Sequence, residues 1–123
     1  MKNFSKRFIV VVLLLVLFSS AEAQQVPSNK EMAYKMSVID GGRFSEKQFE
    51  SVLNVLQSYF PEETYFDICY FISGTHEILQ ETIPSLGLYE FTLGLKNFVR
   101  DSRADTNLRE SLALYGASKM SGY

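Results

Sequence analysis

The sequence contains few of the residues from which metal centres and disulfide frameworks are built. Its 123 residues include one cysteine, Cys69, one histidine, His76, and no tryptophan. A single cysteine excludes a disulfide within the chain, so Cys69 is either buried or used between chains. Ten phenylalanines and seven tyrosines supply large apolar side chains to stabilise the fold instead. A zinc site would need carboxylates beside His76 and Cys69, and no cluster has that spacing, so we expect no metal and no cofactor.

The chain also lacks the spacing of a catalytic constellation. Cys69 and His76 are seven residues apart, about 10 Å along a helix, which is too far for the hydrogen bond of a thiol–imidazole pair. Ser73 could touch His76, but no orienting acid and no oxyanion hole complete a hydrolase. The adjacent Glu62 and Glu63 suit a helix N-terminus better than acid–base chemistry. We therefore predict no catalytic residues and a protein that is not an enzyme.

One long hydrophobic run is present, and it lies near the N-terminus. A basic segment (residues 2–7) precedes an apolar stretch (residues 8–18), and a small-residue motif ending at Ala23 follows. These are the three parts of a secretory signal peptide. The run is about half of the ~20 residues that a membrane-spanning helix requires. We expect cleavage after Ala23, export to the periplasm and no stable membrane anchor.

Basic residues are scarce once this leader is set aside. Residues 24–123 contain nine Lys and Arg against thirteen Asp and Glu, which gives a net charge of −4. That balance disfavours nucleic acid and anionic membranes as partners. The remaining 100 residues suffice for one small domain but not for two. We expect a signal peptide (residues 1–23), a flexible lead-in (24–30) and a single helical domain (31–123).

Hydrophobic spacing predicts an all-α fold, a compact bundle of four to five short helices. Helices are expected over residues 31–39, over 45–60 with a Ser45–Gln48 capping box, onward from Pro61, over 88–100, and from a cap at Asp105 or Thr106 to Gly116. The segment after Pro61 has no polar face, which predicts the central, most buried helix. Its Gly74 indicates either a close crossing by another helix or a local weak spot.

Several short motifs follow one another between about residues 49 and 120. They are Cys69, Ile72 and Gly74, then Ile83-Pro84, then the apolar segment 95–99, then Leu108, Leu112 and Leu114. This order resembles the Rap/Tai-type family of small exported immunity proteins of type VI secretion. The family pattern is a Cys-containing helix, an Ile-Pro turn, a helix with a hydrophobic–basic end and a final Leu/Ala-rich helix.

The resemblance implies a non-enzymatic inhibitor in the periplasm, often a homodimer. Its partner would be a protein effector, a toxin of the cell-wall amidase type, whose active-site groove it blocks. Such a mechanism needs shape complementarity and a few anchors rather than catalytic groups. The residues leave an alternative open, a periplasmic acid-stress chaperone or another small helical binding protein.

The turn at residues 80–87 is the candidate partner-binding segment. Pro84 stiffens it and so reduces the entropy lost on binding. Glu81 supplies charge, and Ile83 and Leu86 are candidate apolar anchors. The alternative is an ordinary helix connection with Ile83 in the core.

Overall fold

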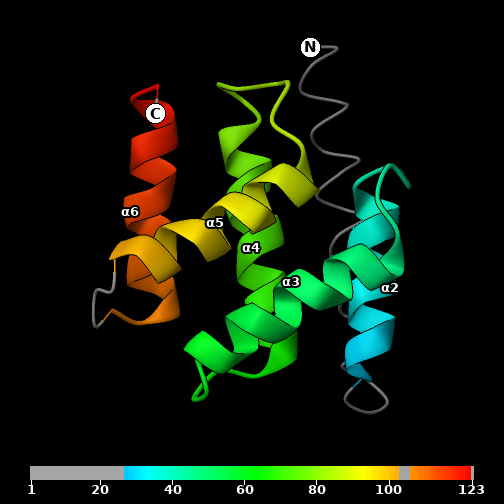
Figure 1. The fold of residues 1–123 in the computed structure, drawn as a ribbon. Helices are drawn as coiled ribbons and strands as arrows, with labels where there is room; N and C mark the ends of the chain where they lie inside the picture. Colours follow the sequence, from blue (N-terminus) through cyan, green and yellow to red (C-terminus); the bar gives the residue numbers. More distant parts are fainter. Residues whose placement is uncertain (1–26, 103–105, 123) are drawn as a thin grey trace.

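The computed structural model describes residues 27–102 and 106–122, which form five α-helices and no strand (Figure 1). In chain order the helices are α2 (Asn29–Ile39), α3 (Glu46–Tyr59), α4 (Tyr65–Leu79), α5 (Leu88–Ser102) and α6 (Leu108–Met120). The all-α bundle expected from the hydrophobic spacing is confirmed. The predicted signal peptide lies outside the described residues, as does the first part of the predicted lead-in.

Polar side chains mark where the first two helices begin. The helix α2 starts two residues before the expected Glu31, because Ser28 caps it by accepting a hydrogen bond from the Glu31 backbone N–H at 3.1 Å. The capping box of α3 is confirmed. The Gln48 N–H donates to Ser45 Oγ at 3.2 Å, and the Ser45 N–H donates to Gln48 Oε1 at 2.8 Å. Local contacts set both helix starts, since donor and acceptor are three residues apart in each case.

The predicted start of α4 at Pro61 was wrong. Residues 61–63 form a turn after α3, closed by a hydrogen bond from the Glu63 N–H to the Phe60 carbonyl at 3.0 Å. The N-cap is Thr64, whose hydroxyl accepts from the Asp67 N–H at 3.0 Å. A side-chain acceptor for an unpaired N–H thus sets the helix start, rather than proline and acidic residues.

The predicted cap of α6 was also wrong. Asn107 caps the helix and forms a reciprocal capping box with Glu110. Thr106 precedes the helix and hydrogen-bonds Ser111 through its hydroxyl at 2.7 Å. The helix continues past Gly116 to Met120.

The helix α4 occupies the centre of the bundle, as predicted, and contacts each of the other four helices. Its residues Ile68, Cys69 and Ile72 are fully buried. Among the described residues, Gly74 has no neighbour within 4 Å of the position that a Cβ would occupy. Of the two explanations given for this glycine, the close helix crossing is therefore not found, and a local weak spot is left. That close approach is found at Gly94 of α5 instead, where the phenol of Tyr115 occupies the space of the missing side chain.

Aromatic contacts attach α5 to its neighbours. Tyr89 stacks on Phe44 with ring centroids 4.2 Å apart, and Phe91 packs against Tyr115 of α6 at 5.2 Å. Buried aromatic pairs of this kind contribute roughly 0.5–1.5 kcal/mol beyond their burial. Within the described ranges, no helix combines the length and the apolar character that crossing a bilayer demands.

Candidate functional site

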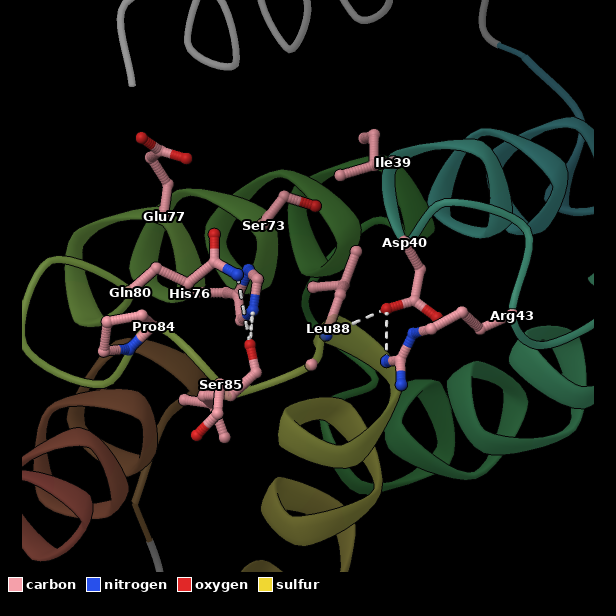
Figure 2. Close-up of a pocket in the computed structure, with 12 residues that line it drawn as sticks. Ile39, Asp40, Arg43, Ser73, His76, Glu77, Gln80, Pro84, Ser85 and Leu88 are labelled. Carbon is pink, nitrogen blue, oxygen red and sulfur yellow. Dashed lines mark hydrogen bonds and ion pairs between the residues drawn. The ribbon is translucent and has the colours of Figure 1, made fainter. Parts of the chain in front are cut away.

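A cavity of about 440 Å³ lies between the end of α2, the last turns of α4 and the α4–α5 turn (Figure 2). Its walls include Asp40, Ser73, His76 and Gln80. Pro84, which is exposed, stands at its rim. The candidate turn at residues 80–87 therefore forms one side of a polar cavity.

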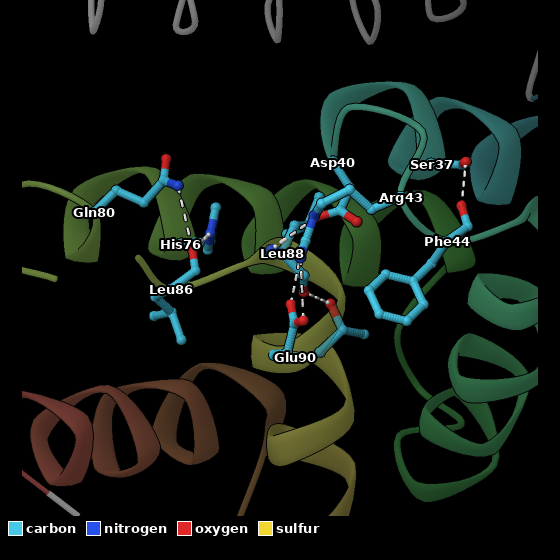
Figure 3. Close-up of polar contacts among 10 residues, drawn as sticks. Ser37, Asp40, Arg43, Phe44, His76, Gln80, Leu86, Leu88 and Glu90 are labelled. Carbon is cyan, nitrogen blue, oxygen red and sulfur yellow. Dashed lines mark hydrogen bonds and ion pairs between the residues drawn. The ribbon is translucent and has the colours of Figure 1, made fainter. Parts of the chain in front are cut away.

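His76 and Gln80 hold this turn through one backbone oxygen. Nε2 of His76 lies 2.7 Å from the Leu86 carbonyl oxygen, and Nε2 of Gln80 donates to the same oxygen at 3.2 Å (Figure 3). A carbonyl oxygen accepts only, so Nε2 of His76 carries a proton and donates. Burial is the largest influence on this imidazole and lowers its pKa, which keeps the ring neutral at pH 7. The histidine is thus buried and hydrogen-bonded within the fold, not solvent-facing.

Asp40 joins the end of α2 to the start of α5. Its side chain is 2% exposed, and Oδ1 accepts hydrogen bonds from the Leu88 N–H at 3.0 Å and from Nη2 of Arg43 at 2.9 Å. Oδ2 has no hydrogen-bond partner among the described residues. Because the N–H groups at a helix start are unpaired and favour negative charge, Asp40 caps α5 from 48 positions away.

Arg43 links the same region to the first turn of α5. Its Nη2 lies 2.8 Å from Oε1 of Glu90, and its Nη1 donates to Oε2 at 3.3 Å. These hydrogen bonds are the largest cause of the lowered pKa of Glu90. Gly87 allows the pair to form beside the backbone, since a Cβ there would collide with both side chains.

The three predicted partner-binding residues have different surroundings. Glu81 is exposed, and Ile83 is half-buried. Leu86 is half-buried, packs against the core and lines the cavity. Hydrogen bonds from the Thr82 and Ile83 N–H groups to the Leu79 carbonyl, at 3.0 and 2.8 Å, order the start of the turn. The structure thus brings Leu86 to His76 and leaves the Glu81 and Ile83 side chains outside the cavity wall.

The remaining candidate nucleophiles are used inside the fold. The Ser73 hydroxyl donates to the sulfur of Met36 at 3.0 Å, so its proton is directed to α2 rather than to His76. Cys69 is free and fully buried, and burial raises the pKa of its thiol, which keeps it protonated and unreactive. No group of three or more His, Cys, Asp and Glu side chains in the described part of the chain is arranged to hold a metal ion.

No protein-family model matches the chain, and neither a curated protein nor a solved structure is significantly similar to it. The function therefore has to be argued from the sequence pattern and from the geometry around the α4–α5 turn.

Sequence reasoning missed the anchoring of this turn. Asp40 followed by two glycines indicates a helix end, and nothing in that local pattern points to a residue 48 positions later. The signal that was present is the isolated His76 in an apolar segment, since a buried imidazole needs a hydrogen-bond partner.

Proposed function

We propose that this chain is an exported, non-enzymatic immunity protein that binds and inhibits a periplasm-acting effector of type VI secretion, of the cell-wall amidase type. The observation that carries the proposal is the anchoring of the α4–α5 turn. His76 and Gln80 bind the Leu86 carbonyl, and Asp40 binds the adjacent Leu88 N–H. A turn held in one conformation before it meets its partner loses less conformational entropy on binding.

The position of the turn also supports this role. It stands at the end of the bundle where α2 and α4 end and α5 begins (Figure 1). Glu81 and Pro84 are exposed there, and Ile83 is half-buried. This combination of a charge, a rigid ring and an apolar side chain on a fixed backbone suits insertion into a groove of a partner protein. Homodimerisation, which the resemblance implies, would leave the same turn available if the dimer forms through helix faces.

The experiment is a competition between bacterial strains. A strain lacking this chain is attacked by its type VI-competent parent, and its survival is measured with the wild-type chain or a variant supplied back. We expect the deletion to lower survival, the wild type to restore it, and Glu81→Lys and Ile83→Lys each to restore it poorly. Glu62→Lys is the matched control, because Glu62 is exposed at the opposite end of α4 and undergoes the same charge change.

Two results would contradict the proposal at different levels. If the deletion strain survives attack as well as its parent, the chain is not an immunity protein against the effectors that the parent strain delivers. If both turn variants unfold at the wild-type temperature and restore full survival, the turn is only a connector and the interface lies on a helix face.

A second candidate function is a periplasmic acid-stress chaperone, and the burial of His76 favours it. A neutral buried imidazole must become charged in acid, which would weaken the attachment of the α4–α5 turn. The chaperone predicts that the protein suppresses aggregation of a denatured client near pH 4 and binds an apolar-surface dye there. An immunity protein without this second role does neither.

A further inference from the structure

The cavity beside the α4–α5 turn has an unusual balance of hydrogen-bonding groups. Each of the three polar side chains on its α4 wall directs one donor into the fold. The Nε2–H of His76 and an Nε2–H of Gln80 both go to the Leu86 carbonyl. The hydroxyl proton of Ser73 goes to the sulfur of Met36. Beyond the second N–H of the Gln80 amide, what these three side chains still offer is acceptors.

Those acceptors can be assigned atom by atom. Because Nε2 of His76 carries the proton of a neutral ring, Nδ1 has a free lone pair. No hydrogen bond to Nδ1 is found among the residues that the structure describes. Nδ1 is also not one of the enclosed polar atoms without a partner, so it is not fully enclosed. The amide oxygen of Gln80 is directed away from Leu86 (Figure 3). Ser73 keeps its oxygen lone pairs.

The charged groups at the cavity also favour a ligand that donates hydrogen bonds and carries positive charge. Asp40 and Glu77 are among the residues that line the cavity. The cation among the described lining residues is Arg43, and its guanidinium is already bound to Asp40 and Glu90. Because one guanidinium, that of Arg43, is shared by two carboxylates, a group that enters the cavity meets acceptors and a net negative charge.

We propose that this cavity receives an arginine side chain of the partner protein. A guanidinium is a cation with five N–H donors and no acceptor, fixed in one plane, so it can serve several separate acceptors at once. Lysine offers three donors at a single point and fits spread acceptors less well. The identity of the partner as an effector rests on the proposed function, whereas the chemistry of the cavity does not.

The test uses a small probe and the fact that His76 is the sole histidine of the chain. Untagged protein, recovered from cells that express the full chain, is titrated with N-acetyl-arginine methylamide while the imidazole C–H resonances are followed by NMR. The neutral isostere N-acetyl-citrulline methylamide and the N-acetyl-lysine-α-methylamide with a free side-chain amine are titrated in parallel. We expect a saturable shift of the His76 resonances, at least about tenfold weaker binding of the citrulline compound, and weaker binding of the lysine compound.

A variant pair checks the location. Glu77→Gln removes one charge from the cavity wall and should weaken the arginine compound by about threefold to tenfold. Glu81→Gln makes the same change on the turn outside the cavity and should leave binding within about twofold of wild type. Thermal unfolding confirms that both variants fold, and the comparison of probes on the wild type needs no variant.

The proposal is overturned if the arginine compound leaves the His76 resonances unmoved up to its solubility limit. It is also overturned if the citrulline or lysine compound binds as tightly as the arginine compound. Failure here, combined with loss of protection by Glu81→Lys, would reject the arginine cavity and leave the proposed function standing. Binding here, combined with full survival of the deletion strain, would reject the immunity role and keep the cavity assignment.

Discussion

Acid should destabilise the protein by protonating His76. This effect should fall between the pKa of the buried ring in the folded protein and the pKa of the same ring in the unfolded chain. The folded protein buries the ring as a neutral donor to Leu86, and desolvation lowers its pKa below the ordinary value of 6.5. The backbone hydrogen bond and the carboxylates of Asp40 and Glu90 partly oppose this effect, whereas Arg43 adds to it. The residue is 6% exposed, so solvent screens these influences little.

The sign follows from proton uptake. Below pH 6.5 the unfolded chain protonates His76, while the folded chain does so only at the lower pKa of the buried ring. The unfolded state therefore binds more protons between these two values, and the free energy of unfolding falls as the pH falls through that window. The contribution of His76 is fully present above pH 6.5. Its loss has a limiting slope of about 1.4 kcal/mol per pH unit, a large fraction of the roughly 5–15 kcal/mol that stabilises a typical domain.

The assay is urea unfolding followed by circular dichroism, between about pH 7.5 and 5, for the wild type and His76→Gln. The glutamine amide can donate to the Leu86 carbonyl but does not titrate. We expect the wild type to lose stability across this range and the variant to change much less. Glu90 does not confuse the comparison, because its lowered pKa confines its effect to pH below the ordinary value of 4.5. Parallel stability curves for the two proteins would refute the reasoning.

Two further predictions concern positions fixed by tertiary contacts. Asp40→Ala should lower the free energy of unfolding by about 2–4 kcal/mol, because the buried Leu88 N–H loses its acceptor. Asp40→Asn should lower it by less. Equal losses for the two variants in urea unfolding would contradict the capping role. Gly94→Ala should cost about 1–3 kcal/mol, because its Cβ would collide with the Tyr115 phenol. Gly116→Ala is the matched helical control, since its Cβ would meet neighbours at 3.9 Å and should stabilise by up to about 1 kcal/mol; a neutral Gly94→Ala would show that the phenol moves aside freely.

Much of the architecture followed from short-range patterns. Apolar residues at helical spacing predicted the all-α bundle, and the Ser45–Gln48 capping box was predicted because its groups are three residues apart. Where two local signals competed, the prediction failed. At the start of α4, proline and acidic residues suggested Pro61, while the Thr64 hydroxyl made the hydrogen bond that sets the helix start.

Glycine shows the limit of sequence reasoning for packing. Gly74 and Gly94 both lie inside apolar helical segments, and the sequence offers no way to rank them. Gly74 has no described neighbour at its Cβ position, whereas Gly94 lies under Tyr115. The difference depends on which helix faces which, and that depends on how all five helices share one core.

The sequence by itself determined the helical class, the burial of the apolar segment around Cys69 and the location of the α4–α5 turn, because those properties depend on hydrophobic periodicity and turn residues within a few positions of each other. Only the tertiary structure decided the character of the candidate site. Asp40 reaches the Leu88 N–H across 48 positions, and Arg43 reaches Glu90 across 47. Such contacts require α2, α4 and α5 to pack first, since no local pattern encodes which distant backbone group a carboxylate or imidazole will meet once apolar burial has brought the helices together.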